Sequence, residues 1–152
     1  MSVKPIPETR TGAFPYLTVR DAAAALEFYK QAFGARELFR IENNHKIGHA
    51  EIEIGTAIIM LSDESPACDA LSPAALGGTP VLIHLYVEDV DRFTEKAIAA
   101  GLKVLRPVAD QFYGDRGGKF EDPFGHRWWF ATHKEDVAPE EMEQRAAALF
   151  GA

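Results

Sequence analysis

Cysteine is nearly absent from this chain, since Cys68 is the only one in 152 residues. An intrachain disulfide and a cysteine-rich zinc module are therefore excluded. A lone thiol is typical of a reducing compartment, so we expect a cytoplasmic location. Positive charge is also scarce, because 16 Lys and Arg stand against 23 Asp and Glu and give a net charge of −7. This balance provides no overall attraction to phosphate backbones, and we expect no nucleic-acid partner.

Long hydrophobic runs are missing as well. The longest apolar stretch, residues 80–87, is interrupted by His84, and the first residues lack the apolar core of a signal peptide. We therefore expect no membrane partner. The composition that remains, 47% hydrophobic and 26% charged, is that of an ordinary globular chain. A chain of this length can build a core that needs no disulfide or metal.

A repeat divides the chain into two similar halves. In each half the order of residue types predicts a strand, an amphipathic helix and three further strands. Asp21 and Asp89 stand at equivalent positions, where a short carboxylate caps the first amides of a helix. Gly34 and Gly101 stand where each helix is expected to end. The chain is therefore expected to consist of two βαβββ modules.

The match between the halves extends into the later strands, where Glu51 aligns with Glu121 and His49 aligns with Lys119. We expect a single domain over residues 1–152. Its expected parts are a first module at about 13–63, a linker at 64–79, a second module at about 80–133 and a C-terminal helix at about 138–150. The linker is rich in Pro, Ser and Gly, and its length fits either a surface crossover or a lid that faces a ligand.

Strand alternation separates a core face from a cleft face, because successive side chains of a strand point to opposite sides. The core set is aliphatic and includes Ala50, Ile52 and Ile54 in the first half and Val81, Ile83, Leu85 and Val87 in the second. The opposite face carries polar and aromatic side chains, namely Tyr16, Thr18, His49, Glu51, His84, Tyr86, Glu121, Arg127 and Trp129. This mixture favours a concave binding cleft, and a flat surface or an interface is the alternative.

Two segments carry a resemblance to a known family: PYLTVRDAAAALEFYKQAFGA and YGDRGGKFEDPFGHRWWFATH. They resemble the vicinal oxygen chelate superfamily, which includes glyoxalase I, bleomycin-resistance proteins, fosfomycin-resistance enzymes and extradiol dioxygenases, and within it the PhnB-like or glyoxalase-like branch. The resemblance covers residues 13–133. It implies an α+β fold of two tandem βαβββ modules that form a curved mixed sheet with a concave cleft, and it implies a homodimer.

In the metal-using members of that superfamily, each module supplies one ligand from its first strand and another from its last. The matching positions of this chain are apolar: Phe14, Leu82, Ile59 or Met60, and Trp129. Divalent metals need oxygen, nitrogen or thiolate donors, so we expect no metal and disfavour a classical glyoxalase I activity. The alternative is a displaced divalent metal held by His49, Glu51, His84 and Glu121.

These observations predict a metal-independent protein that binds an aromatic or amphipathic small molecule in an aromatic-lined cleft. The predicted ligand-binding residues are Tyr16, His49, His84, Tyr86, Tyr113, Arg116, Glu121 and Trp129. For Arg116, an internal salt bridge is the alternative role. The alternative function is a lyase, isomerase or related enzyme in which His84 or Glu121 acts as general base. A pure interaction domain is the third hypothesis.

Overall fold

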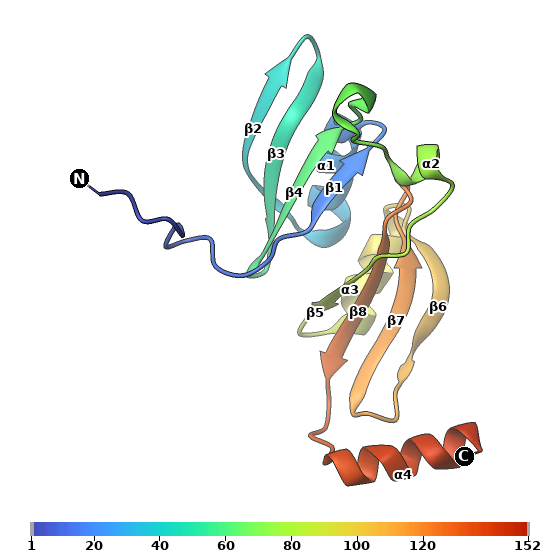
Figure 1. The fold of residues 1–152 in the computed structure, drawn as a ribbon. Coiled ribbons are helices and arrows are strands. Elements are labelled where there is room, and N and C mark those ends of the chain that lie inside the picture. The colour runs from blue at the N-terminus through green and yellow to red at the C-terminus, as the bar shows by residue number, and fades with distance from the viewer. Residues whose placement is uncertain (1, 152) are drawn as a thin grey trace.

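The structure is a computed structural model that describes residues 2–151 and contains two modules of the same build (Figure 1). The first module consists of β1 (Tyr16–Val19), α1 (Ala22–Phe33), β2 (Arg36–Asn43), β3 (Lys46–Ile54) and β4 (Ala57–Asp63). The second consists of β5 (Leu82–Tyr86), α3 (Val90–Ala99), β6 (Lys103–Asp110), β7 (Asp115–Glu121) and β8 (Arg127–His133). The predicted order of one strand, one helix and three strands is confirmed in both halves.

Each module forms one four-stranded mixed sheet. The strand order is β1-β4-β3-β2 in the first sheet and β5-β8-β7-β6 in the second. In both sheets the first and last strands of the module pair in parallel, whereas the other neighbours are antiparallel. The fold is thus α+β with two tandem βαβββ modules, whose strands belong to two separate sheets within the chain.

The helices α1 and α3 begin as the residue types predict. The Asp21 carboxylate accepts a hydrogen bond from the Ala24 amide at 3.0 Å, and Asp89 accepts one from the Arg92 amide at 3.0 Å. Gly34 ends α1 with a φ of 65°, which lies in the left-handed region that glycine adopts without a steric penalty. The matched carboxylate caps therefore set the same strand-to-helix junction in both modules.

One hydrophobic core is shared by the two modules. Helix α1 of the first module places the ring of Phe33 5.0 Å from Trp128 and 5.0 Å from Phe130, centroid to centroid, on β8 of the second module. The fully buried Tyr29 of α1 donates a hydrogen bond to Asp122 at 2.6 Å. Because aromatic burial dominates core energetics, these contacts tie the folding of each module to the other.

The helices cover one face of each sheet and leave the other face open (Figure 1). The predicted inward residues Ala50, Ile52 and Ile54 are buried, as expected. The prediction for Val81 is wrong, because this residue precedes β5 and is 61% exposed. Ile83 is only half-buried against the core, since β5 is an edge strand of its sheet.

The remaining segments are a linker and a C-terminal helix. The linker is ordered by a 3₁₀ turn at Pro66–Cys68 and the one-turn helix α2 (Pro73–Leu76), and the buried Ser72 donates a hydrogen bond to Glu64. The predicted C-terminal helix is present as α4 (Pro139–Phe150), at the far end of the second sheet (Figure 1). Within residues 2–151, each helix is too short or too polar to cross a membrane.

Candidate functional site

The open face of the second sheet carries a row of four side chains, one from each strand. Directly paired residues point to the same side of a sheet, and the register pairs Arg106 with Lys119 and Lys119 with Trp129. It also pairs Trp129 with His84. We call these four residues the cationic row. The row combines two cations with two aromatic rings.

A cavity of about 400 Å³ opens above the cationic row, and three members of the row line it: His84, Arg106 and Trp129. Its lining combines side chains from the sheet, from the segment between β6 and β7 and from the end of α4: Leu82, His84, Arg106, Asp110, Gln111, Phe112, Tyr113, Trp129, Leu149 and Phe150. Small-molecule sites usually measure about 300–1,000 Å³, so this volume suits a compact ligand. Helix α4 supplies one wall of the cavity.

The aromatic side chains of this cavity contact one another. The ring of His84 lies 4.8 Å from Tyr86 and 6.5 Å from Trp129, centroid to centroid. Phe112 meets Phe150 edge to face. Trp129 is 7% exposed, and its Nε1–H has no hydrogen-bond acceptor within the described part of the chain. Rings of this kind offer flat surfaces on which a planar ligand stacks.

Within residues 2–151, the two cations of the row have no acidic side chain bound to them. Among the described residues, neither Arg106 nor Lys119 takes part in an ion pair. The acidic residue of the lining, Asp110, is itself bound by Arg116, with 3.2 Å between Arg116 Nη1 and Asp110 Oδ1. Uncompensated positive charge therefore faces this side of the second sheet.

The equivalent row of the first sheet consists of Phe39, Glu51, Met60 and Tyr16. Its polar groups bind one another. The Tyr16 hydroxyl lies 2.8 Å from His49 Nδ1, and His49 Nε2 lies 3.2 Å from Glu51 Oε1. A carboxylate beside Nε2 favours the proton on that nitrogen, so Nδ1 accepts from the Tyr16 hydroxyl. We call Tyr16, His49 and Glu51 the Tyr–His–Glu chain.

Arg10, from the segment before β1, closes the Tyr–His–Glu chain. Its Nη2 donates to Glu51 Oε2 at 2.6 Å, and the Glu51 side chain is only 8% exposed. Burial acts to raise the pKa of Glu51, but hydrogen bonds from Arg10 and His49 outweigh it and hold the pKa below its usual value. The first module thus satisfies its buried carboxylate internally.

Two further residues predicted to bind ligand are engaged by neighbouring carboxylates. Tyr86 is 59% exposed, and its hydroxyl donates to Asp115 at 2.7 Å. Arg116 follows the opposite alternation from Lys119 and binds Asp91 of α3 at 2.8 Å, on the helix side of the sheet. The sequence predicted an internal salt bridge with Asp115 or Glu121 as the alternative role of Arg116, and the structure shows such a salt bridge with Asp91 and Asp110 instead.

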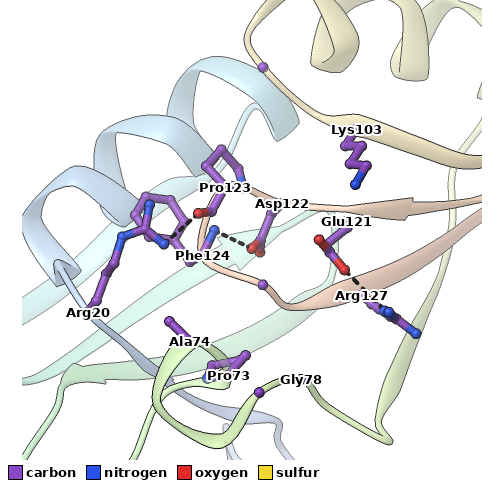
Figure 2. A pocket seen from close by; sticks show the side chains of 13 residues that line it. Arg20, Pro73, Ala74, Gly78, Lys103, Glu121, Asp122, Pro123, Phe124 and Arg127 are labelled. Atoms are coloured by element: carbon purple, nitrogen blue, oxygen red, sulfur yellow. Dashed lines mark hydrogen bonds and ion pairs between the residues drawn. The ribbon is translucent and has the colours of Figure 1, made fainter.

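Glu121 lies in a second cavity of about 450 Å³, beside the turn between β7 and β8 (Figure 2). Its carboxylate accepts a hydrogen bond from Arg127 at 3.2 Å. On the same cavity, Arg20 donates to the Pro123 carbonyl at 2.6 Å. The linings of the two cavities share no residue, so Glu121 does not line the cavity above the cationic row.

The structure thus divides the predicted ligand-binding residues. It brings His84, Tyr113 and Trp129 together in one cavity, and it places Tyr16 and His49 together on the other sheet. Sequence reasoning did not identify Arg10, which binds Glu51 of the first row, or four residues of the cavity lining: Arg106, Phe112, Leu149 and Phe150. The available signal for the last two was the helical spacing of Met142, Ala146, Leu149 and Phe150, which places them on one apolar face.

The strand register corrects the alignment of the two halves. Glu51 pairs with Met60 as Lys119 pairs with Trp129, so Glu51 and Lys119 occupy the same place in their sheets. The alignment of Glu51 with Glu121 is therefore wrong. Its cause is a difference in turn length, because β4 begins at 57 after β3 ends at 54, whereas β8 begins at 127 after β7 ends at 121.

The positions that hold a metal in members of the resembled superfamily do not fit one here. Met60 faces the open side, whereas Ile59 is 2% exposed and belongs to the core. Of these two residues, Met60 is therefore the one that stands at the metal-ligand position of the first module. The residues of the displaced alternative are divided between the sheets, with His49 and Glu51 on the first and His84 and Glu121 on the second. Across residues 2–151, no group of three or more His, Cys, Asp or Glu side chains is placed to hold a metal ion.

Comparison with known proteins identifies sequence relatives. A family model for the Glyoxalase/Bleomycin resistance protein/Dioxygenase superfamily matches residues 11–130. The chain is 41% identical over 133 residues to Mb0911c, an uncharacterized protein of Mycobacterium bovis, and the match covers 85% of this chain and 88% of the relative.

Solved structures show the same fold. TioX from Micromonospora sp. ML1 superposes with a TM-score of 0.65 at 26% identity, covering 84% of this chain and 100% of TioX. The fosfomycin resistance protein FosX from Mesorhizobium loti superposes with a TM-score of 0.59 at 19% identity, covering 82% of this chain and 92% of FosX. The likeness to FosX is one of fold alone.

Proposed function

Because the chain belongs to the glyoxalase/bleomycin resistance protein/dioxygenase superfamily, we propose that it is a metal-independent binding protein for a small aromatic or amphipathic molecule. The proposed site is the cavity above the cationic row. The observation that carries the proposal is the convergence of His84, Tyr113 and Trp129 on a cavity of about 400 Å³. Aromatic walls with a small number of polar groups are typical of sites that hold a planar ligand without chemistry.

Metal independence rests on donor chemistry. The positions used for metal ligands in the superfamily carry Phe14, Leu82, Met60 and Trp129. An indole N–H donates hydrogen bonds only, and the other three side chains offer no oxygen or nitrogen to a divalent cation. The buried carboxylate of the first row, Glu51, is already held by Arg10 at 2.6 Å.

Trp129 and Met60 allow a matched test, since they occupy the same place in the two sheets. The probe is N-phenyl-1-naphthylamine, a planar aromatic molecule whose fluorescence rises in apolar sites. We expect Trp129→Ala to weaken its binding by about ten-fold, because an indole ring that lines the cavity is lost. Met60→Ala is expected to bind within about two-fold of wild type. Equal affinities in all three proteins would overturn the proposal.

We also infer that the protein is a homodimer in which a second copy covers exposed apolar side chains of the open sheet faces that lie outside the cavity. Large apolar side chains remain exposed there, including Tyr16 at 50%, Phe39 at 45% and Tyr86 at 59%. Exposed apolar surface of this kind marks an interaction site. Sedimentation velocity is expected to give twice the mass of one chain at micromolar concentration. The PhnB-like branch and a cytoplasmic location stay predictions from the sequence.

The Tyr–His–Glu chain favours a second candidate function, an isomerase or lyase that works by acid–base chemistry. His49 Nδ1 accepts from the Tyr16 hydroxyl at 2.8 Å, which makes Tyr16 the group that exchanges a proton with a bound molecule. The earlier candidates are less well arranged for this role, because Glu121 is bound by Arg127 and because His84 has ring contacts but no side-chain hydrogen bond within residues 2–151.

Solvent exchange tests this second candidate. Hydroxyacetone and pyruvate are incubated with the protein in D₂O, and deuterium incorporation beside the carbonyl is followed by NMR. Acid–base catalysis predicts an exchange rate at least about ten-fold above that of Tyr16→Phe, in which the proton-carrying oxygen is missing. Equal rates for wild type, Tyr16→Phe and buffer would remove the candidate for these substrates.

A further inference from the structure

We propose that the cavity above the cationic row selects a planar aromatic ligand that carries an acidic group, which Arg106 and Lys119 hold. This inference rests on the proposed binding function and names its ligand class. The acidic group is a carboxylate or a sulfonate, and the ring system stacks on Trp129 and His84.

The first argument is the position of the two cations. Arg106 lines the cavity together with Trp129, and Lys119 stands between them in the row, on the same face of the sheet. A ligand whose ring lies on Trp129 therefore brings a substituent on its edge towards two positive charges. A guanidinium presents a planar fork of donors that matches a carboxylate or sulfonate.

The second argument is the absence of a competing anion. Within residues 2–151, Arg106 and Lys119 have no ion-pair partner, whereas each of the other four arginines in the strands has one. Asp110, the only acidic side chain of the cavity lining, is bound by Arg116. Charges that are not paired within the protein remain available to a ligand.

The third argument is the contrast with the first sheet. At the place of Lys119 the first sheet has Glu51, and at the place of Arg106 it has Phe39. That row is closed by Arg10, so its charge is already neutralised. The chain as a whole is acidic, with a net charge of −7, which makes the cationic row a local feature of the second module.

Two probes that differ by one acidic group test the inference: 8-anilinonaphthalene-1-sulfonate and its uncharged parent N-phenyl-1-naphthylamine. Affinities are measured by fluorescence titration at about 0.05 M salt, where charge interactions are least screened. We expect wild type to bind the sulfonate about ten-fold more tightly than the parent. Arg106→Gln and Lys119→Gln are each expected to lose about five-fold for the sulfonate and less than about two-fold for the parent.

Lys103→Gln is the matched control, since Lys103 is an exposed cation of β6 that lines the other cavity. It is expected to change neither affinity. Arg106→Glu is expected to reverse the preference and favour the uncharged parent. Equal binding of the two probes by wild type, or no change in Arg106→Gln and Arg106→Glu, overturns the inference but leaves the proposed binding function intact. Failure of both probes to bind, or an unchanged Trp129→Ala, counts against the binding function itself.

Discussion

The two sheets share one topology but differ in how their open faces treat polar groups. In the first sheet Tyr16, His49 and Glu51 form a hydrogen-bonded chain that Arg10 closes. In the second sheet the equivalent row has two cations beside a buried tryptophan, and no acidic partner of these cations lies among the residues that the structure describes. The same backbone therefore supports one face whose polar groups are satisfied internally and another whose charges remain available.

The difference shows how a duplicated module can specialise. A buried carboxylate must be paired, and the first module achieves this with an arginine from outside its sheet. Cations at the rim of an open cavity need no acidic partner within the protein, because water solvates them until a ligand replaces that water. The second module also has a wall from α4, whereas β4 of the first module is followed by the short 3₁₀ turn at Pro66–Cys68 and by α2.

The largest contrast that we expect concerns the buried carboxylates that anchor each module. Asp122 accepts from the Tyr29 hydroxyl, the Trp128 indole and two backbone amides, whereas Asp63 accepts from two amides only. Asp122→Ala is expected to lower the free energy of unfolding by about 4 kcal/mol and Asp63→Ala by about 2 kcal/mol, since more buried donors lose their acceptor in the first. Urea denaturation measures both values, and an equal loss would contradict the ranking.

Arg10→Met tests whether the first face depends on its external cation. Removing Arg10 leaves the Glu51 carboxylate with His49 alone, and we expect a loss of about 1–2 kcal/mol in unfolding free energy. The pKa of Glu51 is lowered in the folded state, so its contribution to stability is present at neutral pH and lost as the pH falls through that pKa.

The deficit of Arg10→Met should therefore be largest above about pH 5 and shrink in more acidic buffer. Lys4→Met is the matched control, because Lys4 and Glu8 form an exposed pair in the same segment. It is expected to leave the unfolding free energy within about 0.5 kcal/mol of wild type. A deficit that does not depend on pH would show that Arg10 acts through packing instead.

Phe150→Ala tests the wall that only the second face possesses. Phe150 is 74% exposed and contacts Phe112 edge to face at 5.9 Å, so it covers the cavity only in part. We expect the affinity for N-phenyl-1-naphthylamine to fall by about three-fold, because part of the apolar wall is lost. Ile41→Ala removes an exposed apolar side chain from the first sheet and should leave the affinity unchanged. A larger effect of Ile41→Ala than of Phe150→Ala would place the ligand on the other sheet.

The smallest expected effect is a dependence of stability on pH that belongs to the second module. Hydrogen bonds to Asp115 and Asp136 raise the pKa of His133. Because the pKa is higher in the folded state, protonated His133 stabilises the fold at pH values below its unfolded-state pKa of about 6.5. This stabilisation is lost as the pH rises through the pKa of the folded state. His133→Asn should flatten the decline in stability above about pH 6.5. The control is His45→Asn, in the β2–β3 turn of the first module. If the unfolding free energy of both variants depends on pH in the same way, the decline is not caused by His133.

Local chemistry explains why much of the fold could be predicted. The aspartate caps, the glycine after α1 and the helix at Pro139–Phe150 depend on residues within one or two turns of chain. The cleft face followed from strand alternation, which placed His84 and Trp129 on the same side before any pairing was known. The alignment of Glu51 with Glu121 was wrong because matching residue types do not show that the β3–β4 and β7–β8 turns differ in length.

Patterns within the sequence predict the two βαβββ modules, their helix boundaries and the residues available to each open face, because these follow from short-range hydrogen bonding and from the period of hydrophobic side chains. The difference between the two faces, by contrast, depends on long-range packing. The contact of Arg10 with Glu51 joins residues 41 positions apart, and the wall that α4 lends to the second sheet arises from the packing of separate elements. Such contacts depend on where the whole chain brings its side chains together, so no local pattern specifies them.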